Sequence, residues 1–388
     1  MSEPLLETAD RLAKVLAEHA ASVDAQARFP VEGVRALRES GFLGLLVPRA
    51  FGGLEADLPT FSAIAQRLAG SCLSTAMVWA MHCQQVAILV AHAGPELEAS
   101  LLPRLGAGKV YLASITTDPS NGGDPLVAQS PLLERGANVA FSRESPVVTG
   151  GENADGYLLT LKASEAATPA QVVFAYADRA QVELTQVEPW ALMGMRGTRN
   201  VKLTISGQVP RTQVLGLGGA GPDIVADTLV PMGHIAWASC WLGAARGLLV
   251  QMLQALRADP RRRRALASDL LAVKMGDVEL KLDAAEVYLR RVVDDYQRVR
   301  TSPQGTAELR SYEFHRRLNG LKVLAASTAF AAVDALLEDA GFRGGYLQSA
   351  PLPVERVFRD LRSASLMVPN ERLLLLNGRT LLMGWGAQ

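Results

Sequence analysis

The sequence is poor in cysteine and in aromatic residues, and it carries no net charge. Three cysteines occur, at positions 72, 83 and 240, far apart and without a Cys-x-x-Cys spacing. This pattern argues against a disulfide scaffold or a zinc site and favours a cytoplasmic protein with buried thiols and no metal. Lysine and arginine together number 39, as do aspartate and glutamate. Binding to nucleic acid or to an anionic membrane needs a basic face. The balanced charge of this sequence therefore gives no support to either kind of partner.

The sequence also shows neither a secretion signal nor an apolar membrane-spanning segment free of polar residues. The N-terminal stretch "MSEPLLETADRLAKVLAEH" is amphipathic and charged, unlike a signal peptide. The longest apolar stretch, Leu73 to Gly94, has His82, Gln84 and Gln85 near its middle. We therefore expect this stretch to be a buried helix and not a membrane span.

What the sequence does have is the composition of a folded globular protein of more than one domain. It contains 388 residues, of which 49% are hydrophobic and 20% are charged. Helical periodicity dominates the N-terminal part, short strand-like runs separated by turn residues follow, and long helical patterns fill the remainder. We predict an α+β protein with domains at 1–112, 113–218 and 219–388.

The stretch "TTDPSNGGD", Thr116 to Asp124, follows the apolar run "VYLAS" and is rich in turn-forming residues. Glycine, proline, asparagine and aspartate together predict a loop. Adjacent glycines also let backbone N–H groups approach a ring or a phosphate closely. The residues alone leave both interpretations open: a simple turn, or a loop that holds a ligand.

Several motifs in order along nearly the whole chain resemble those of the acyl-CoA dehydrogenase superfamily of flavoproteins. They are "ESGFLGLLVPRAFGGLEADLPTFSAIAQRLA", "GPELEASLLPRLGAGK", "TTDPSNGGD", "VVTGGENADGYLL", "LMGMRGTRNVKLTISGQVP" and "GGYLQSAPLPVERVFRD". The resemblance implies an acyl-CoA dehydrogenase-like fold, with an N-terminal α-helical domain, a middle β-barrel domain and a C-terminal four-helix bundle. It also implies FAD as cofactor, an acyl thioester as substrate, and a homodimer or homotetramer.

The same resemblance assigns residues to the flavin site. Thr117 and Thr149 match flavin-contacting threonines of the family. Thr116 and Gly122 lie next to the expected flavin contacts Thr117 and Gly123 and are also assigned to the cofactor site. Gly123 stands where a phosphate-contacting serine is usual, so a backbone N–H would serve there. Val147 stands where a tryptophan usually packs on the flavin, which loosens the packing or makes room for another group.

Two further segments are expected to reach the FAD of a neighbouring subunit. Arg257, or the run Arg261–Arg264, would pair with the pyrophosphate, although a solvated turn is an equally good interpretation of the run. Gly344 and Gly345 would let the backbone approach the cofactor. Gly341 replaces a glutamine of the family pattern. Downstream, Arg356, Arg359 and Asp360 are expected to form a structural ion-pair cluster.

The usual catalytic base is absent. In the family, a glutamate eight positions after the aspartate equivalent to Asp360 removes the α-proton, but Val368 occupies that position here. A second known placement falls on Gly233, beside His234. The candidates that remain are His234, which titrates near neutrality, and Glu371, for which a first-turn helix carboxylate is the favoured alternative. Asp223 and Asp227 are weaker candidates.

These departures favour one hypothesis over two others. Dehydrogenation needs a base, whereas an oxygen-dependent reaction needs access of O2 to the flavin and a pocket sheltered from water. His82, Gln84, Gln85 and His234 are polar residues that would line such a pocket. We therefore favour an oxygenase-type flavoenzyme over an ordinary dehydrogenase that uses Glu371, and over a non-catalytic subunit.

Overall fold

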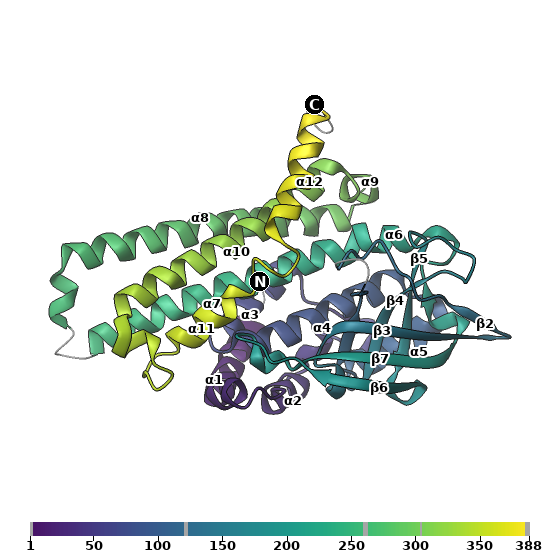
Figure 1. Ribbon diagram of the computed structural model, residues 1–388, viewed down its shortest axis with the longest axis horizontal. Helices are drawn as coiled ribbons and strands as arrows, with labels where there is room; N and C mark the ends of the chain where they lie inside the picture. Colours follow the sequence, from purple (N-terminus) through teal and green to yellow (C-terminus); the bar gives the residue numbers. More distant parts are fainter. Residues whose placement is uncertain (1–2, 120–122, 259–262, 303–304, 385–388) are drawn as a thin grey trace.

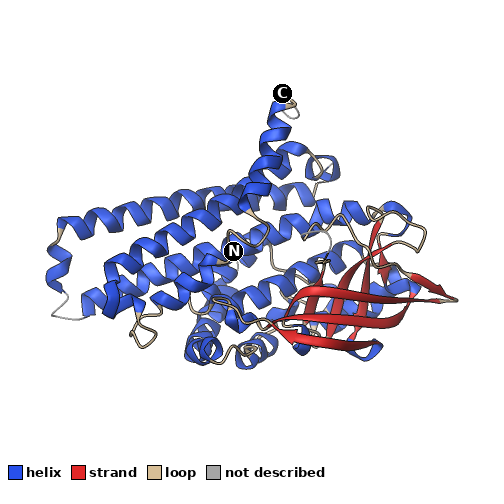
Figure 2. Ribbon diagram, in the orientation of Figure 1, coloured by secondary structure: helices blue, strands red, loops and turns tan. Residues whose placement is uncertain are grey.

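The computed structural model describes residues 3–119, 123–258, 263–302 and 305–384. Helices occupy both ends of the chain, and the strands lie between them (Figures 1 and 2). The N-terminal helices are α1 (Glu3–Ala25), α2 (Val31–Glu39), α3 (Leu58–Ala69), α4 (Leu73–His92) and α5 (Pro95–Gly106). The side chain of Asp57 caps α3 by accepting a hydrogen bond from the N–H of Thr60.

The strands form two four-stranded sheets. They are β1 (Leu112–Ile115), β2 (Leu133–Arg135), β3 (Asn138–Thr149), β4 (Gly156–Lys162), β5 (Val172–Asp178), β6 (Val182–Pro189), β7 (Asn200–Pro210) and β8 (Val214–Leu215). One sheet has the order β1-β4-β5-β8 and the other β2-β3-β7-β6. The β1–β4 pair is parallel, and the other pairs are antiparallel. Strand β3 breaks its register with β7 between Ser145 and Val148, which re-aims the end of the strand.

The C-terminal part is a helical bundle. Its elements are α6 (Gly221–Ile224), a π-helical turn (Val225–Leu229), α7 (Val230–Ala258), α8 (Asp269–Arg300), α9 (Gly305–Leu309), α10 (Tyr312–Gly341), a second π-helical turn (Phe342–Tyr346), α11 (Val354–Arg362) and α12 (Asn370–Leu382). Helices α7, α8, α10 and α11 run side by side, and α12 projects from the bundle (Figure 1). The predicted helix–β–helix architecture is confirmed.

The buried helix predicted around residues 73–94 is α4. Its apolar window is 89% buried inside the protein, and a second stretch, Tyr312–Tyr346, is also long and apolar enough to cross a membrane. The burial of α4 explains its composition, because a helix that is apolar on all sides belongs in a core. The three cysteines are free and buried, as predicted.

Helix α11 contacts both the loop before β7 and the end of α1. Asp360 of α11 accepts a hydrogen bond from the backbone N–H of Met195. Arg359 pairs with Asp24 at 2.6 Å and with Glu355 at 2.7 Å. The predicted ion-pair cluster forms in part: Arg359 pairs with Asp24 and Glu355, whereas Asp360 accepts from the backbone of the loop before β7.

Candidate flavin and substrate site

The loop that begins at Thr116 leaves β1 and runs toward α12. Thr116 and Thr117 are half-buried. The hydroxyl of Ser145 in β3 donates to the carbonyl oxygen of Thr117 at 3.1 Å. At the other end of the loop, Asp124 pairs with Arg372 of α12 at 2.6 Å. The loop is therefore held between the β domain and the C-terminal bundle.

The end of β3 lies beside this loop. Val147 and Thr149 are half-buried. The hydroxyl of Thr149 donates to Oδ1 of Asn200 at 2.9 Å, so its oxygen can still accept hydrogen bonds. The β-branched side chain of Val147 leaves more room than a tryptophan would.

These residues fit a flavin. Gly123 has a φ of +82°, and a Cβ added there would meet nothing within 4 Å. A backbone in this left-handed conformation with open space beside it can approach a planar ring or a phosphate closely. Together with the half-buried hydroxyls of Thr117 and Thr149, it would hold the polar edge of the ring system. Gly122 lies outside the described residues.

The segment around Val368, where the sequence comparison expects a catalytic base, is built around a buried lysine. Val368 has a φ of +51°, a left-handed conformation that is rare for a β-branched residue. Lys322 of α10, which is fully buried, donates to the carbonyl oxygens of Val368 at 2.7 Å and Ala364 at 3.0 Å, and to Oδ1 of Asn370 at 2.8 Å. Burial lowers the pKa of Lys322 to about 8.

Glu371, the candidate substitute base, lies in the first turn of α12 and is exposed. Pro369 is the N-cap residue of that helix, directly before Asn370, so the helix starts just before Glu371, as the sequence suggested. A general base in this family needs a dry pocket to tune its pKa, and the exposed carboxylate of Glu371 does not have one within this chain.

His234, the other candidate, is buried in the first half of α7. Burial and the nearby positive charge of Lys322 lower the pKa of His234 to about 3, so its ring is neutral at pH 7. Its Nδ1 atom is buried and has no hydrogen-bond partner. One residue earlier, Gly233 faces Gln84: a Cβ on Gly233 would lie 2.6 Å from Nε2 of Gln84.

Gln84 supports the π-helical turn before α7. Its Nε2 donates to the carbonyl oxygen of Leu229 at 2.6 Å, and Nε2 of Gln85 donates to Oε1 of Gln84 at 3.1 Å. His82 is different: its two ring nitrogens bond the carbonyl oxygen of Leu43 and the N–H of Leu112. His82 therefore ties α4 to the start of β1, and the expectation that it lines a pocket is not supported.

The weaker acidic candidates are used in ion pairs. Arg310 contacts Asp227 at 2.7 Å and Asp223 at 3.1 Å. The hydroxyl of Tyr296 donates to the backbone carbonyl of Asp227. These contacts fix the start of the bundle, and neither carboxylate is free to act as a base.

The residues predicted to serve a neighbouring subunit lie at the other end of the bundle. Arg257 is exposed in the last turn of α7, and Gly344 and Gly345 lie in the π-helical turn after α10. Figure 1 shows both segments at the end of the bundle remote from the sheets. They are therefore not brought together with Thr117 and Thr149 within one chain. Arg261 and Arg262 lie outside the described residues.

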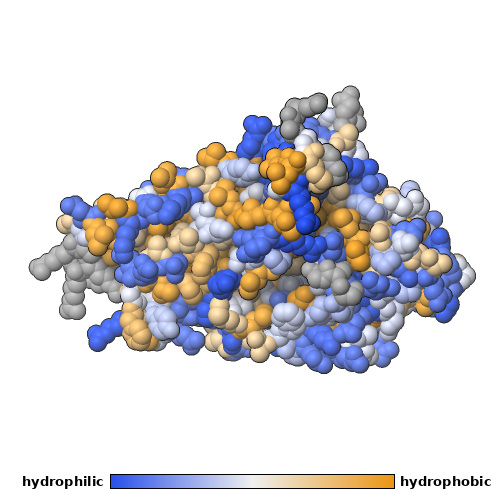
Figure 3. All heavy atoms as spheres, turned by 45° about the horizontal axis from the view of Figure 1, so that its top comes forward, coloured by the Kyte–Doolittle hydropathy of each residue, from blue (hydrophilic) through white to orange (hydrophobic). Residues whose placement is uncertain are grey.

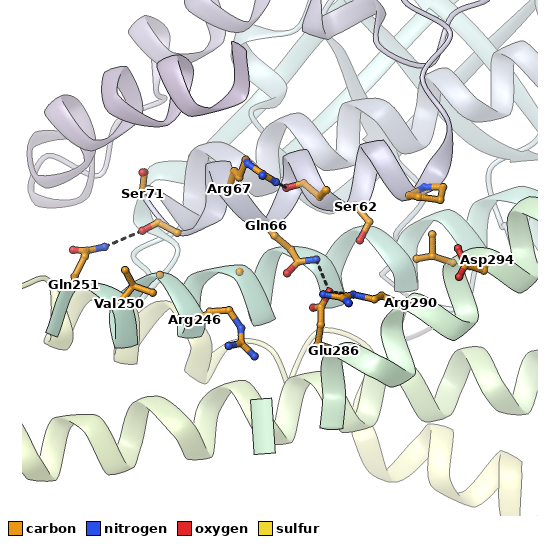
Figure 4. Close-up of a pocket in the computed structure, with 16 residues that line it drawn as sticks. Ser62, Gln66, Arg67, Ser71, Arg246, Val250, Gln251, Glu286, Arg290 and Asp294 are labelled. Atoms are coloured by element: carbon orange, nitrogen blue, oxygen red, sulfur yellow. Dashed lines mark hydrogen bonds and ion pairs between the residues drawn. The ribbon is translucent and has the colours of Figure 1, made fainter. Parts of the chain in front are cut away.

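The structure also has a groove of about 780 Å³ between α3, α7 and α8 (Figure 4). In it, Gln66 and Arg290 both contact Oε1 of Glu286. The lining residues are Pro59, Ser62, Ala63, Gln66, Arg67, Gly70, Ser71, Gly243, Arg246, Gly247, Val250, Gln251, Glu286, Arg290, Val293 and Asp294. None of the predicted site residues lines this groove.

Three residues of the site region were missed from the sequence: Lys322, Trp237 and Trp241. Trp237 and Trp241 lie on α7 beyond His234, with ring centroids 6.2 Å apart. Nζ of Lys322 lies 5.6 Å from the Trp241 ring. A lysine inside the apolar pattern "LNGLKVLAAS" was a usable signal, because a fully buried lysine needs several acceptors.

Comparison with known proteins agrees with this geometry. Residues 3–109 match the family described as "Acyl-CoA dehydrogenase, N-terminal domain", and residues 235–367 match "Acyl-CoA dehydrogenase, C-terminal domain". The chain is 24% identical over 387 residues to cyclohex-1-ene-1-carbonyl-CoA dehydrogenase of Syntrophus aciditrophicus, which covers 97% of this chain and 89% of the relative.

A nitrososynthase and the structure of a monooxygenase are matched as well. The chain is 24% identical over 377 residues to the amino sugar nitrososynthase DnmZ of Streptomyces peucetius, covering 94% of this chain and 89% of the relative. Its fold is similar to that of FMN-bound TdsC, a dibenzothiophene monooxygenase of Paenibacillus sp. A11-2, with a TM-score of 0.86, 21% identity and 98% of each chain covered. The sequence matches at both ends and the helix–sheet–helix fold together show that the chain belongs to the acyl-CoA dehydrogenase superfamily of flavin-dependent oxidoreductases.

Proposed function

We propose that this protein binds FAD and, after an external two-electron donor has reduced the flavin, uses O2 to oxidise an acyl thioester or a similar small organic substrate. The observation that carries the proposal is Val368. This residue occupies the position from which the glutamate of a dehydrogenase would act, and valine cannot accept a proton. Glu371, the nearest substitute along the chain, is exposed. A reaction that needs no α-proton base agrees best with this arrangement.

A bound flavin would supply the redox chemistry, and the protein's own residues would bind and shelter it. Thr117 and Thr149 would orient the polar edge of the ring. Lys322 holds the segment before α12 against α10 through the carbonyl oxygens of Val368 and Ala364. Val368 and the tryptophans of α7 would keep water out, which an oxygen-dependent reaction requires.

We propose FAD over FMN because Arg257 and the Gly344–Gly345 pair fit the second half of a dinucleotide held across a dimer. The relative TdsC binds FMN, so the two cofactors must be distinguished directly. Flavin released from the purified protein by heat and identified by mass gives the answer. FMN alone would remove the role proposed for Arg257 and the two glycines.

Ordinary dehydrogenation is the second candidate, favoured by the relative that acts on cyclohex-1-ene-1-carbonyl-CoA. Anaerobic bleaching of the flavin by a panel of acyl-CoA substrates separates the two reactions, with wild type and Glu371→Gln side by side. We expect no acyl-CoA to bleach the flavin without O2. Bleaching of the wild type that Glu371→Gln loses, by the factor of about 10²–10⁴ typical of a general base, would establish the dehydrogenase.

A further inference from the structure

The groove between α3, α7 and α8 is lined by none of the residues assigned to the flavin (Figure 4). Its volume of about 780 Å³ is typical of sites that bind small molecules. Helices α3 and α7 close its floor through glycines. A Cβ on Gly243 would lie 2.5 Å from the carbonyl oxygen of Gln66, and a Cβ on Gly247 would lie 2.4 Å from Cα of Gly70. An occupant therefore lies along the groove and does not pass through it.

The centre of the groove holds a carboxylate with one unused oxygen. Glu286 of α8 lines the groove and is only 8% exposed. Its Oε1 atom accepts hydrogen bonds from Nε2 of Gln66 at 3.3 Å and from Nε of Arg290 at 3.0 Å. Its Oε2 atom is buried and has no hydrogen-bond partner. Such atoms are few in native proteins, and this one indicates that a bound group donates to Glu286.

The side chain of Gln66 reaches from α3 to this carboxylate (Figure 4). Its hydrogen bond, at 3.3 Å, is longer than the usual range of about 2.7–3.2 Å for N–H···O bonds. A hydrogen bond from a charged donor to a carboxylate is about twice as strong as one from a neutral donor. An ammonium group can therefore take the place of the Gln66 amide and bind both oxygens of Glu286.

The charges around the groove also favour a cation. The three arginines that line it each have a carboxylate partner already: the pairs are Arg67–Asp10, Arg246–Asp283 and Arg290–Glu286. Asp294 is a further lining carboxylate, and it is exposed. Its side chain has no hydrogen bond or ion pair with the part of the chain that the structure describes. The negative charges therefore exceed the positive charges by one, which attracts a cation.

The spacing of the two carboxylates limits the shape of the ligand. Asp294 follows Glu286 by eight residues on α8, which corresponds to about 12 Å along the helix axis. The groove also has apolar lining residues, among them Pro59, Ala63 and Val293. Methylene groups pack favourably against such side chains. An extended eight-carbon chain with an amine at each end is of about the right length.

We propose that this groove binds a linear aliphatic diamine. One ammonium group binds Glu286 in place of the Gln66 amide, and the methylene chain lies against the apolar lining residues. The second ammonium group pairs with Asp294. This inference is independent of the flavin and of the reaction proposed above, because it uses none of their residues.

The test is calorimetric titration of the flavin-loaded protein with three probes of equal chain length: 1,8-diaminooctane, octylamine and 1,8-octanediol. We expect the diamine to bind most tightly. Octylamine should bind about two- to fivefold more weakly, because an exposed ion pair such as that with Asp294 contributes little. The neutral diol should bind about tenfold or more weakly than octylamine, because it lacks the charged donor for Glu286.

Three variants separate the contacts. Glu286→Gln should weaken binding of both amines about tenfold or more. Asp294→Asn should remove the preference for the diamine and leave octylamine unchanged. Gln66→Ala should tighten binding of both amines about two- to tenfold, because the competing amide is gone. Glu279→Gln, at an exposed residue of α8 outside the groove, is the matched control and should change neither amine.

Two results would overturn the proposal. If no probe binds, water alone satisfies Oε2 of Glu286. If octylamine and the diol bind equally, the groove takes an aliphatic chain without recognising its charge. Should Glu286→Gln fail to fold, the other two variants decide: tighter binding to Gln66→Ala and a lost diamine preference in Asp294→Asn support the proposal, and unchanged affinities in both overturn it.

Discussion

The Nζ atom of Lys322 lies 2.7 Å from the carbonyl oxygen of Val368, and this bond joins the middle of α10 to the segment between α11 and α12. Val368 is held in a left-handed backbone conformation there, which costs a β-branched residue about 1–3 kcal/mol. A strained residue persists only when its surroundings fix it, so the hydrogen bonds from Lys322 hold this segment in its conformation.

Replacing Lys322 with methionine should therefore destabilise the protein. The change keeps most of the apolar stem but leaves the acceptors of Ala364, Val368 and Asn370 without their donor. Each unsatisfied buried acceptor costs about 1–3 kcal/mol, so we expect a loss of at least about 2 kcal/mol in urea unfolding. Lys109→Met, at an exposed lysine, is the control. Equal unfolding midpoints for the two variants would contradict the role assigned to Lys322.

Replacing both Thr117 and Thr149 with valine should weaken flavin retention. Each lost hydrogen bond costs about 1 kcal/mol, so the flavin should bind on the order of tenfold or more weakly. The flavin remaining after gel filtration measures this, with Thr185→Val on the exposed side of β6 as control. Unchanged flavin content in the double variant would show that the 116–124 loop is only a turn.

Asp360 should make stability depend on pH. Burial raises the pKa of its carboxyl group from an ordinary value near 3.8 to about 7. A raised pKa in the folded state means that the folded protein binds more protons than the unfolded chain between these two values. The stabilisation is thus complete below about pH 4 and is lost as the pH rises through about 7.

We expect Asp360→Asn to flatten this dependence, although the variant keeps an acceptor for the N–H of Met195. The measurement is the free energy of unfolding of both proteins between pH 4 and pH 8. If the difference between wild type and variant is constant across that range, the buried carboxyl does not titrate as described.

Self-association is expected from the exposed apolar surface. Five leucines on α12 are more than half exposed, among them Leu375 at 53% and Leu382 at 90%. Phe342 and Tyr346 beside the Gly344–Gly345 pair are also exposed. Figure 3 shows apolar side chains gathered on the bundle side of the molecule. Exposed patches of this kind usually mark contacts with a partner.

We predict a homodimer or homotetramer whose contacts include these surfaces. Sedimentation of the purified protein should show it, and Leu375→Glu combined with Leu382→Glu should produce a smaller species. A wild-type monomer that still holds its flavin stoichiometrically would contradict the proposal that Arg257, Gly344 and Gly345 complete the site across a dimer.

The architecture was predictable from the sequence because it follows from periodicity and turn residues. The apolar run of α4, the strand spacing between residues 112 and 215, and the long C-terminal helices each carry a local signal. The ion-pair role of Arg359 was also predictable, since residues at helical spacing beside an acidic partner pair readily.

The candidate site was harder to predict from the sequence, because its key contacts join residues far apart in the chain. Nothing near Lys322 in the sequence shows that its acceptors lie beyond α11. His82 was assigned to the pocket because it is polar in an apolar helix, yet its partners are backbone groups of Leu43 and Leu112. A hydrogen bond to a main-chain group does not depend on the side chain of the residue that provides the group, so the sequence does not reveal it.

The π-helical turn at Val225–Leu229 has a bearing on how this chain is aligned with its relatives. A π-turn holds one more residue than an α-helical turn, and each residue of an α-helix accounts for about 100° of rotation. A relative with a regular helix at this point presents a different side chain after the same count of residues. The place that counting assigns to Gly233 is then occupied by His234. Superposition of the backbones, and not residue counting, is therefore the proper basis for matching any catalytic group on α7.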